Sequence, residues 1–163
     1  MTQKLTANKN LVSFFIVILI FLIDRISKIW IINKNFENNQ NEIYFSKYLN
    51  IELIWNKGIA FGLLSFDKAS FYHIITIIIF IVILILMFLI TKSFGMEKYS
   101  YILISGGALG NLFDRILYQE VPDFIDFHIN NFHWFIFNTA DIFITVGVLC
   151  LICIEVFKKN LNE

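Results

Sequence analysis

Residues 71–90 read FYHIITIIIFIVILILMFLI, an apolar stretch without a single Asp, Glu, Lys or Arg. A helix that spans the hydrocarbon core of a bilayer needs about 20 predominantly apolar residues, and this stretch has that length. The whole chain is 58% hydrophobic and only 16% charged, whereas a soluble domain usually carries about 25% charged residues. One domain of this size cannot bury so much apolar surface in its own core. The sequence therefore predicts a membrane protein.

Three further stretches have the length of a membrane span but contain polar residues. They are residues 11–32, with charges in the second half, and residues 99–117 and 135–157, with inserted Gly, Asn and Asp. We predict one integral membrane domain over residues 1–163, an all-α bundle of four transmembrane helices. Because the number of spans is even, both termini are expected on the same side.

Basic residues near the ends of the spans indicate the orientation. The side that carries the termini holds six lysines close to the helix ends: Lys4, Lys9, Lys92, Lys98, Lys158 and Lys159. This bias favours cytoplasmic termini, with an outer loop at residues 34–70 and an outer connection at residues 118–134. Within the outer loop, residues 43–55 (IYFSKYLNIELIW) are rich in β-branched and aromatic residues. That pattern predicts a pair of short strands, a small extracytoplasmic β element.

The N-terminus resembles a signal peptide, because Lys4 and Lys9 precede an apolar stretch. No small-residue cleavage site follows, and the charged Asp24, Arg25 and Lys28 come next. We expect an uncleaved first helix.

Several kinds of chemistry are not favoured. The net charge is zero, so there is no basic field for nucleic acid. Cys150 and Cys153 form a C-x-x-C in an apolar run without a second pair, which favours packing residues that face lipid. The histidines at positions 73, 128 and 133 form no H-E-x-x-H motif, so a zinc protease is not expected.

Ionisable residues are expensive inside a bilayer and therefore point to function or to pairing. In the predicted topology they gather at the outer ends of the helices. Asp24 and Lys28 are four residues apart, which permits an ion pair on one helix face. Asp114 has Arg115 beside it, and Lys28 or Arg25 could reach it across the bundle. We interpret Asp24, Lys28, Asp114 and Arg115 as a structural ion-pair network.

Three other acids have no such partners. Between Arg115 and Lys158 there is no Lys or Arg, yet this interval holds Asp123, Asp126 and Asp141. Burial raises the pKa of an unpaired carboxylate, and two neighbouring carboxylates can hold one proton between them. Aspartic proteases need that state. Asp141 taken alone could instead be an acid favoured at the start of a helix.

Five segments, in order along the chain, resemble the motifs of the bacterial lipoprotein signal peptidases (signal peptidase II). They are DRISK (24–28), NKGIAFG (56–62), GNLFDR (110–115), VPDFI (121–125) and FNTAD (137–141). The segments spread over nearly the whole chain, and their common order makes the resemblance specific.

The resemblance implies an intramembrane aspartic endopeptidase whose catalytic residues are Asp123 and Asp141. It implies that Asn56, Gly58, Asn111, Arg115 and Asn138 support the substrate or the catalytic pair, and that Asp114 is structural. Such an enzyme removes the signal peptide from diacylglyceryl-modified prolipoproteins and cleaves before the lipidated cysteine. It uses neither a metal nor an organic cofactor, and globomycin is expected to block it.

The same resemblance implies a monomer in the bacterial cytoplasmic (inner) membrane, in contact with membrane lipid and with its active site near the extracytoplasmic face. Pro122 is expected to stiffen the turn that carries Asp123. The alternative is a component of a small proton-linked membrane transporter, in which Asp123, Asp141 and Arg115 form a proton relay. A relay should continue across the membrane, and the apolar inner halves of the helices disfavour it.

Overall fold

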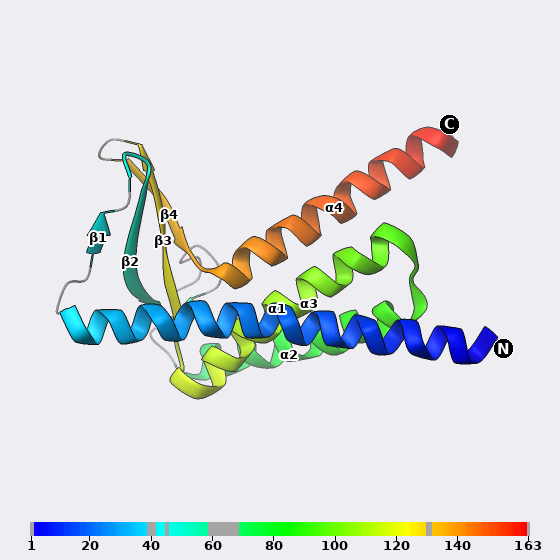
Figure 1. Ribbon diagram of the computed structural model, residues 1–163, viewed down its shortest axis with the longest axis horizontal. Coiled ribbons are helices and arrows are strands. Elements are labelled where there is room, and N and C mark those ends of the chain that lie inside the picture. The colour runs from blue at the N-terminus through cyan, green and yellow to red at the C-terminus, as the bar shows by residue number, and fades with distance from the viewer. Residues whose placement is uncertain (1, 39–41, 45, 59–68, 130–131, 163) are drawn as a thin grey trace.

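The computed structural model describes residues 2–38, 42–44, 46–58, 69–129 and 132–162 of the 163-residue chain. These residues form four helices: α1 (Thr2–Asn38), α2 (Ala69–Lys92), α3 (Gly95–Tyr118) and α4 (Thr139–Asn162). Figure 1 shows α1 running along the length of the molecule, with a β-sheet near its C-terminal end and both chain termini at the other end. The predicted four-helix fold is confirmed.

The outer surface of the helices is apolar. Within α2 and α4, the stretches Tyr72–Lys92 and Thr139–Lys158 are long and apolar enough to cross a membrane. Large apolar side chains are exposed on all four helices, among them Phe15, Ile26, Phe88, Ile116 and Phe157. Such a continuous apolar surface is unfavourable in water and is stable against lipid. The prediction of a membrane protein is confirmed.

Glycines bring α1, α3 and α4 into close contact. A Cβ atom at Gly106 would lie 2.7 Å from the side chain of Ile20 on α1, and one at Gly110 would collide with the carboxylate of Asp24. A Cβ atom at Gly107 would collide with the main chain of α4. The G-x-x-x-G pair on α3 therefore lets α1 approach so closely that the Asp24 carboxylate packs against the α3 backbone.

The sheet is larger than the sequence suggested. Its order is β1-β2-β3-β4 with antiparallel neighbours, and its strands are β1 (Glu42–Tyr44), β2 (Leu49–Asn56), β3 (Val121–Ile129) and β4 (Phe132–Phe137). The expected strand pair in the outer loop is present as β1 and β2. The connection at residues 118–134 supplies a second hairpin, and α4 begins at Thr139 instead of residue 135. The apolar and aromatic residues 132–137 are compatible with either a strand or the start of a helix. They form a strand because they pair with β3.

Asp123 lies within strand β3 and not in the expected turn. Residues Val121 to Asp123 pair with β2, whereas pairing with β4 starts only at Ile125. Pro122 therefore has a neighbouring strand on one side only, a position at which a sheet can tolerate a proline.

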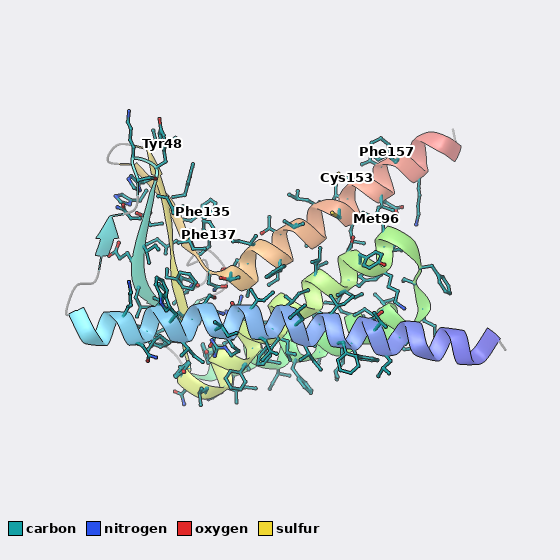
Figure 2. The ribbon with its side chains drawn as sticks, viewed as in Figure 1. Tyr48, Met96, Phe135, Phe137, Cys153 and Phe157 are labelled. Atoms are coloured by element: carbon teal, nitrogen blue, oxygen red, sulfur yellow. The ribbon has the colours of Figure 1, made fainter. Side chains whose placement is uncertain are left out.

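Figure 2 shows different side chains at the two ends of the molecule. Tyr48, Phe135 and Phe137 lie at the sheet end, and Met96, Cys153 and Phe157 lie at the opposite end. At the sheet end, Tyr48 is exposed, and Trp55 packs edge-on against Tyr118 with ring centroids 5.3 Å apart. The side chains of Tyr44 and Phe45 lie outside the described residues. At the opposite end, Cys150 and Cys153 are free thiols.

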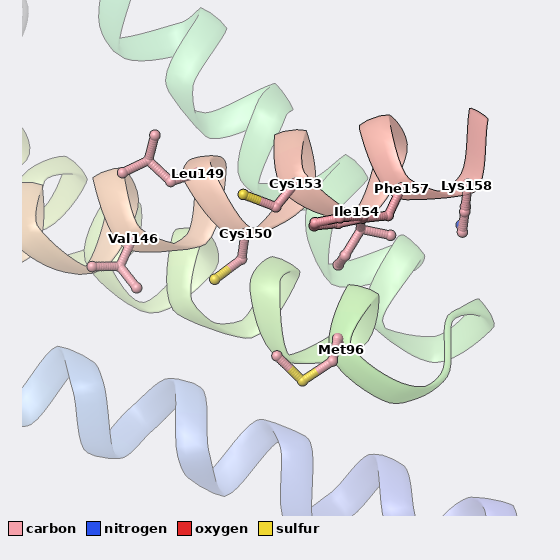
Figure 3. A pocket seen from close by; sticks show the side chains of 8 residues that line it. All are labelled: Met96, Val146, Leu149, Cys150, Cys153, Ile154, Phe157 and Lys158. Atoms are coloured by element: carbon pink, nitrogen blue, oxygen red, sulfur yellow. The ribbon is translucent and has the colours of Figure 1, made fainter. Parts of the chain in front are cut away.

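These cysteines line an apolar groove of about 480 Å³ between α4 and the start of α3 (Figure 3). The other lining residues are Met96, Val146, Leu149, Ile154, Phe157 and Lys158. The groove lies at the end of the molecule away from the sheet, and it contains none of the candidate site residues.

Candidate active site

Asp123 lies near the start of β3, where this strand pairs with β2, and it is buried. Asn138 donates its side-chain amide to Asp123 Oδ1 at 2.6 Å, and Asn56 donates to Oδ2 at 2.9 Å. Both carboxylate oxygens are thus bound by neutral amides.

Asp141 lies in the first turn of α4 and is held in the same way. Asn111 on α3 donates to Asp141 Oδ1 at 2.9 Å, and the backbone N–H of Asn138 donates to Oδ2 at 3.2 Å. In return, the backbone N–H of Asp141 donates to Asn138 Oδ1 at 3.2 Å. This reciprocal pair is a capping box with Asn138 as the N-cap. It places the Asp141 carboxylate at the positive end of the α4 dipole.

Asn138 connects the two aspartates. Its carbonyl oxygen accepts the amide of Asp141, so its NH₂ group is left to donate to Asp123. Asn138 therefore binds both carboxylates, that of Asp123 through its side chain and that of Asp141 through its backbone N–H, and so links their positions.

Asn56, Gly58 and Arg115 form a second support on the β2 side. Asn56 Oδ1 accepts the backbone N–H of Gly58 at 2.7 Å, which orients its NH₂ group toward Asp123. Arg115 donates from Nη2 to the carbonyl oxygen of Gly58 at 2.7 Å and from Nη1 to that of Asn111 at 3.3 Å. The structure thus gathers the residues expected to support the site. The remainder of the NKGIAFG segment lies outside the described residues.

The expected ion-pair network exists, but its membership differs from the prediction. Lys28 is fully buried and donates to Asp24 at 2.8 Å, to Asp114 at 2.7 Å and to Asn111 at 2.9 Å. Asp114 is paired with Lys28 and with Arg25, whose Nη1 is 2.7 Å from Oδ1. Arg115, its neighbour in sequence, instead binds main-chain carbonyls, because adjacent residues on a helix point in different directions.

Two contacts link this network to the catalytic candidates, and neither was predicted. Asn111 accepts Lys28 and donates to Asp141. Asp24 accepts the backbone N–H of Ala140 at 2.9 Å, so that a carboxylate from α1 caps the first turn of α4. No local pattern in the sequence signals a cap supplied from a residue more than a hundred positions away.

The electrostatics of Asp123 follow from this geometry. Burial, and next the negative charge of Asp141, raise the pKa of Asp123 from 3.8 to about 6, while the hydrogen bonds from Asn56 and Asn138 oppose the rise. Among the described residues, no Lys or Arg nitrogen forms an ion pair with Asp123 or Asp141. Two such carboxylates can hold one proton between them near neutral pH.

Asp126, the third acid left open by the sequence, lies elsewhere. Its carboxylate is 2.8 Å from Nδ1 of His133, and in the described part of the chain it shares no hydrogen-bond partner with Asp123 or Asp141. The geometry joins Asp123 to Asp141 and leaves Asp126 outside the pair.

Known proteins with similar sequences are signal peptidases. The family model described as Signal peptidase (SPase) II matches residues 16–157. A lipoprotein signal peptidase of Pelagibacter ubique (strain HTCC1062) is 47% identical over 158 residues, covering 97% of this chain and 95% of the relative. One from Francisella tularensis subsp. novicida (strain U112) is 41% identical over 151 residues, covering 90% and 92%.

Solved structures of a bacterial membrane enzyme have a similar fold. A structure described as a bacterial membrane enzyme, obtained by the in meso method at 2.3 Å resolution, matches with a TM-score of 0.70 and 32% identity over 93% of this chain and 91% of that one. A second, at 1.9 Å, matches with a TM-score of 0.68 and 32% identity over 88% and 92%. The resemblance seen in the five sequence segments is confirmed, and the chain belongs to the signal peptidase II family.

Proposed function

We propose that this chain is an aspartic endopeptidase that removes the signal peptide from diacylglyceryl-modified prolipoproteins, cleaving just before the lipidated cysteine. Asp123 and Asp141 are the catalytic pair. The observation that carries the proposal is their shared contact with Asn138 in a site where both carboxylates are bound by neutral donors. Family membership supports the substrate class.

In the reaction, the pair begins with one proton. The ionised carboxylate removes a proton from water, whose oxygen attacks the carbonyl carbon of the scissile peptide bond, while the protonated partner donates its proton to the carbonyl oxygen. The resulting gem-diol then collapses. The C–N bond breaks, the amine of the lipidated cysteine takes the proton gained from water, and the diol proton returns to the other carboxylate. One water is consumed, and the pair again holds one proton.

The supporting residues act on orientation and charge. Asn56, Asn111 and Asn138 fix the carboxylates without neutralising them, so one proton remains available to the pair. Arg115 holds the turn at Gly58 and thereby the direction of the Asn56 amide. Every one of these groups comes from a single chain, which supports a monomeric enzyme formed by one membrane domain.

We place the enzyme in the cytoplasmic membrane with cytoplasmic termini and the active site near the extracytoplasmic face. Both termini lie at the end of the molecule opposite the sheet (Figure 1), and the lysines flank that end of the helices. A diacylglyceryl anchor in the outer leaflet would then bring the scissile bond close to the Asp123–Asp141 pair.

Cleavage of a lipidated prolipoprotein peptide by the detergent-purified protein tests the function. Asp123→Asn and Asp141→Asn should each lower kcat by about 10²–10⁴-fold, the range for lost general acid–base catalysis, while the helical circular dichroism stays unchanged. Glu120→Gln is the matched control. It removes a carboxylate three residues from Asp123 that forms a partly exposed ion pair with Lys57, and it should keep wild-type turnover. Full activity in either aspartate variant would rule out the pair.

A further inference from the structure

A second cluster of polar side chains lies on the β3–β4 hairpin. Asp126 and His128 are two residues apart in β3 and so point to the same face of the sheet, and His133 in β4 is the register partner of His128. Asp126 Oδ2 lies 2.8 Å from His133 Nδ1 and 3.4 Å from His128 Nδ1. Each of the three residues offers one atom that could bind a metal ion, and these three atoms lie within 4.8 Å of one another.

Two polar atoms of this cluster lack a hydrogen-bond partner among the described residues. Asp126 is fully buried and His128 is 7% exposed. In the described part of the chain, Asp126 Oδ1 and His128 Nδ1 are buried and have no hydrogen-bond partner, although His128 Nδ1 lies 3.4 Å from Asp126 Oδ2. An unpaired polar atom in a buried position costs free energy, and in native proteins an ion often supplies the missing partner.

We propose that Asp126, His128 and His133 bind a divalent transition-metal ion of the Zn²⁺ class. Two imidazole nitrogens and one carboxylate oxygen are a donor set that suits such ions and not Mg²⁺ or Ca²⁺, which prefer oxygen ligands alone. Bond lengths of about 2.0–2.2 Å to a tetrahedral Zn²⁺ place ligand atoms about 3.3 Å apart. The two observed distances to Asp126 lie on either side of that value.

The exposure of the three ligands gives the ion a route from solution. His133 is 53% exposed on its side chain, whereas the other two ligands are covered. An ion can therefore reach the cluster from solution by binding first to the exposed His133 ring. A water molecule can complete its coordination at the fourth position. Binding replaces the hydrogen between His133 Nδ1 and Asp126 Oδ2. That proton moves to Nε2 of the ring or to solvent, and no oxidation state changes.

The bound ion would join β3 to β4. Asp126 follows Asp123 by three residues in the same strand, so the ion restrains the strand that carries one member of the catalytic pair without touching that pair. The site rests on its own three ligands and does not depend on the proposed peptidase activity, because metal binding is measured without turnover.

The experiment uses the full-length protein in detergent with any oligohistidine tag removed. The chain is freed of metal with a chelator, equilibrated with Zn²⁺ and dialysed, and the bound metal is measured by mass spectrometry. We expect one Zn²⁺ per chain and a higher Tm with Zn²⁺ than without. Substitution of Co²⁺ should give the visible absorption of a tetrahedral site.

Variants identify the ligands. His133→Ala, at an exposed position, and Asp126→Asn should lose the stoichiometric ion and the Tm response. The control is His73→Ala, which removes an exposed imidazole on α2 and should bind Zn²⁺ like the wild type. The proposal is overturned if the wild type retains no Zn²⁺ at micromolar concentration, or if His133→Ala retains as much as the wild type. A Tm that Zn²⁺ does not raise, in a chain that retains no stoichiometric ion, would identify a simple Asp–His hydrogen-bonded cluster and would likewise overturn it.

Discussion

Two pairs of buried aspartates lie close together in this protein, linked through Asn111, and they are held by different kinds of partner. Asp24 and Asp114 share the ammonium group of Lys28, and Asp114 also pairs with Arg25. Asp123 and Asp141 are bound by the amides of Asn56, Asn111 and Asn138 and by a backbone N–H. Both pairs are acids in an apolar bundle, but only the first has its charge cancelled.

This difference in partners suits the Asp24–Asp114 pair to a structural role and the Asp123–Asp141 pair to acid–base chemistry. A cation at ion-pair distance offsets the negative charge of a carboxylate and holds it in place, so the first pair is a fixed structural element. An amide orients a carboxylate while leaving its proton exchangeable, which suits it for acid–base work. The nature of the donor therefore distinguishes the two pairs more clearly than burial does.

Removal of the shared cation should have the largest effect on stability. Lys28→Met leaves the two carboxylates of Asp24 and Asp114 buried with one fewer cation, and breaking a buried pair in this way costs about 3–5 kcal/mol. We expect a much lower Tm in detergent, measured by tryptophan fluorescence. Lys57→Met is the matched control, because Lys57 makes an exposed ion pair with Glu120, and it should cost less than about 1 kcal/mol. Equal losses in the two variants would contradict the structural role of the network.

The stability of the Asp123–Asp141 pair should respond in the opposite direction. The pKa of Asp123 is raised from 3.8 to about 6, so this group contributes stability that is fully present below its ordinary pKa and is lost as the pH rises through about 6. The difference between the ordinary pKa of 3.8 and the raised pKa of about 6 corresponds to about 3 kcal/mol in the free energy of unfolding. Asp123→Asn should therefore be inactive, yet at pH 8 as stable as the wild type or more so, although one of its two amide donors loses an acceptor.

Thermal unfolding of both proteins from pH 4 to pH 8 measures this. The wild-type Tm should fall across the window more steeply than that of Asp123→Asn. A variant several degrees less stable than the wild type at pH 8 would show that the Asp123 charge is stabilising, as in the Lys28 network.

A smaller change should shift the pH dependence of catalysis. Asn56→Ala removes a donor that lowers the pKa of Asp123, so this pKa should rise further. The limb of the kcat/KM profile that reports the ionisation of Asp123 should then move to higher pH, with turnover retained. Asn33→Ala, on an exposed position of α1, is the control and should leave the profile in place. A profile that Asn56→Ala does not move would mean that the amide does not control the ionisation of Asp123.

The helices and the division of the acids into paired and unpaired groups could be predicted from the sequence because both depend on local signals. Residues 71–90 are apolar without interruption, and the spacing of Asp24 and Lys28 permits their ion pair directly. The absence of Lys and Arg between Arg115 and Lys158 separated Asp123, Asp126 and Asp141 from the paired acids. The choice of Asp123 over Asp126 needed the family resemblance.

The remaining features depend on contacts between distant segments. The β3–β4 hairpin joins a sheet begun by residues far away in the chain, and its aromatic residues could as well have opened α4. Asp24 caps α4 only because Gly110 lets α1 approach α3. The Asp126–His128–His133 cluster arises from strand register, which residue spacing alone does not reveal.

The length of α1 has a geometric consequence for the substrate. Its 37 residues extend about 55 Å at 1.5 Å per residue, whereas the hydrocarbon core of a bilayer is about 30 Å thick and the whole bilayer about 40–45 Å. Even at a typical tilt of about 20°, α1 is longer than the bilayer is thick. Part of α1 must therefore lie outside the hydrocarbon core, and the sheet lies beside the C-terminal end of this helix (Figure 1). A peptide anchored by acyl chains can then approach the Asp123–Asp141 pair laterally, beneath the sheet, while its anchor stays in the lipid layer.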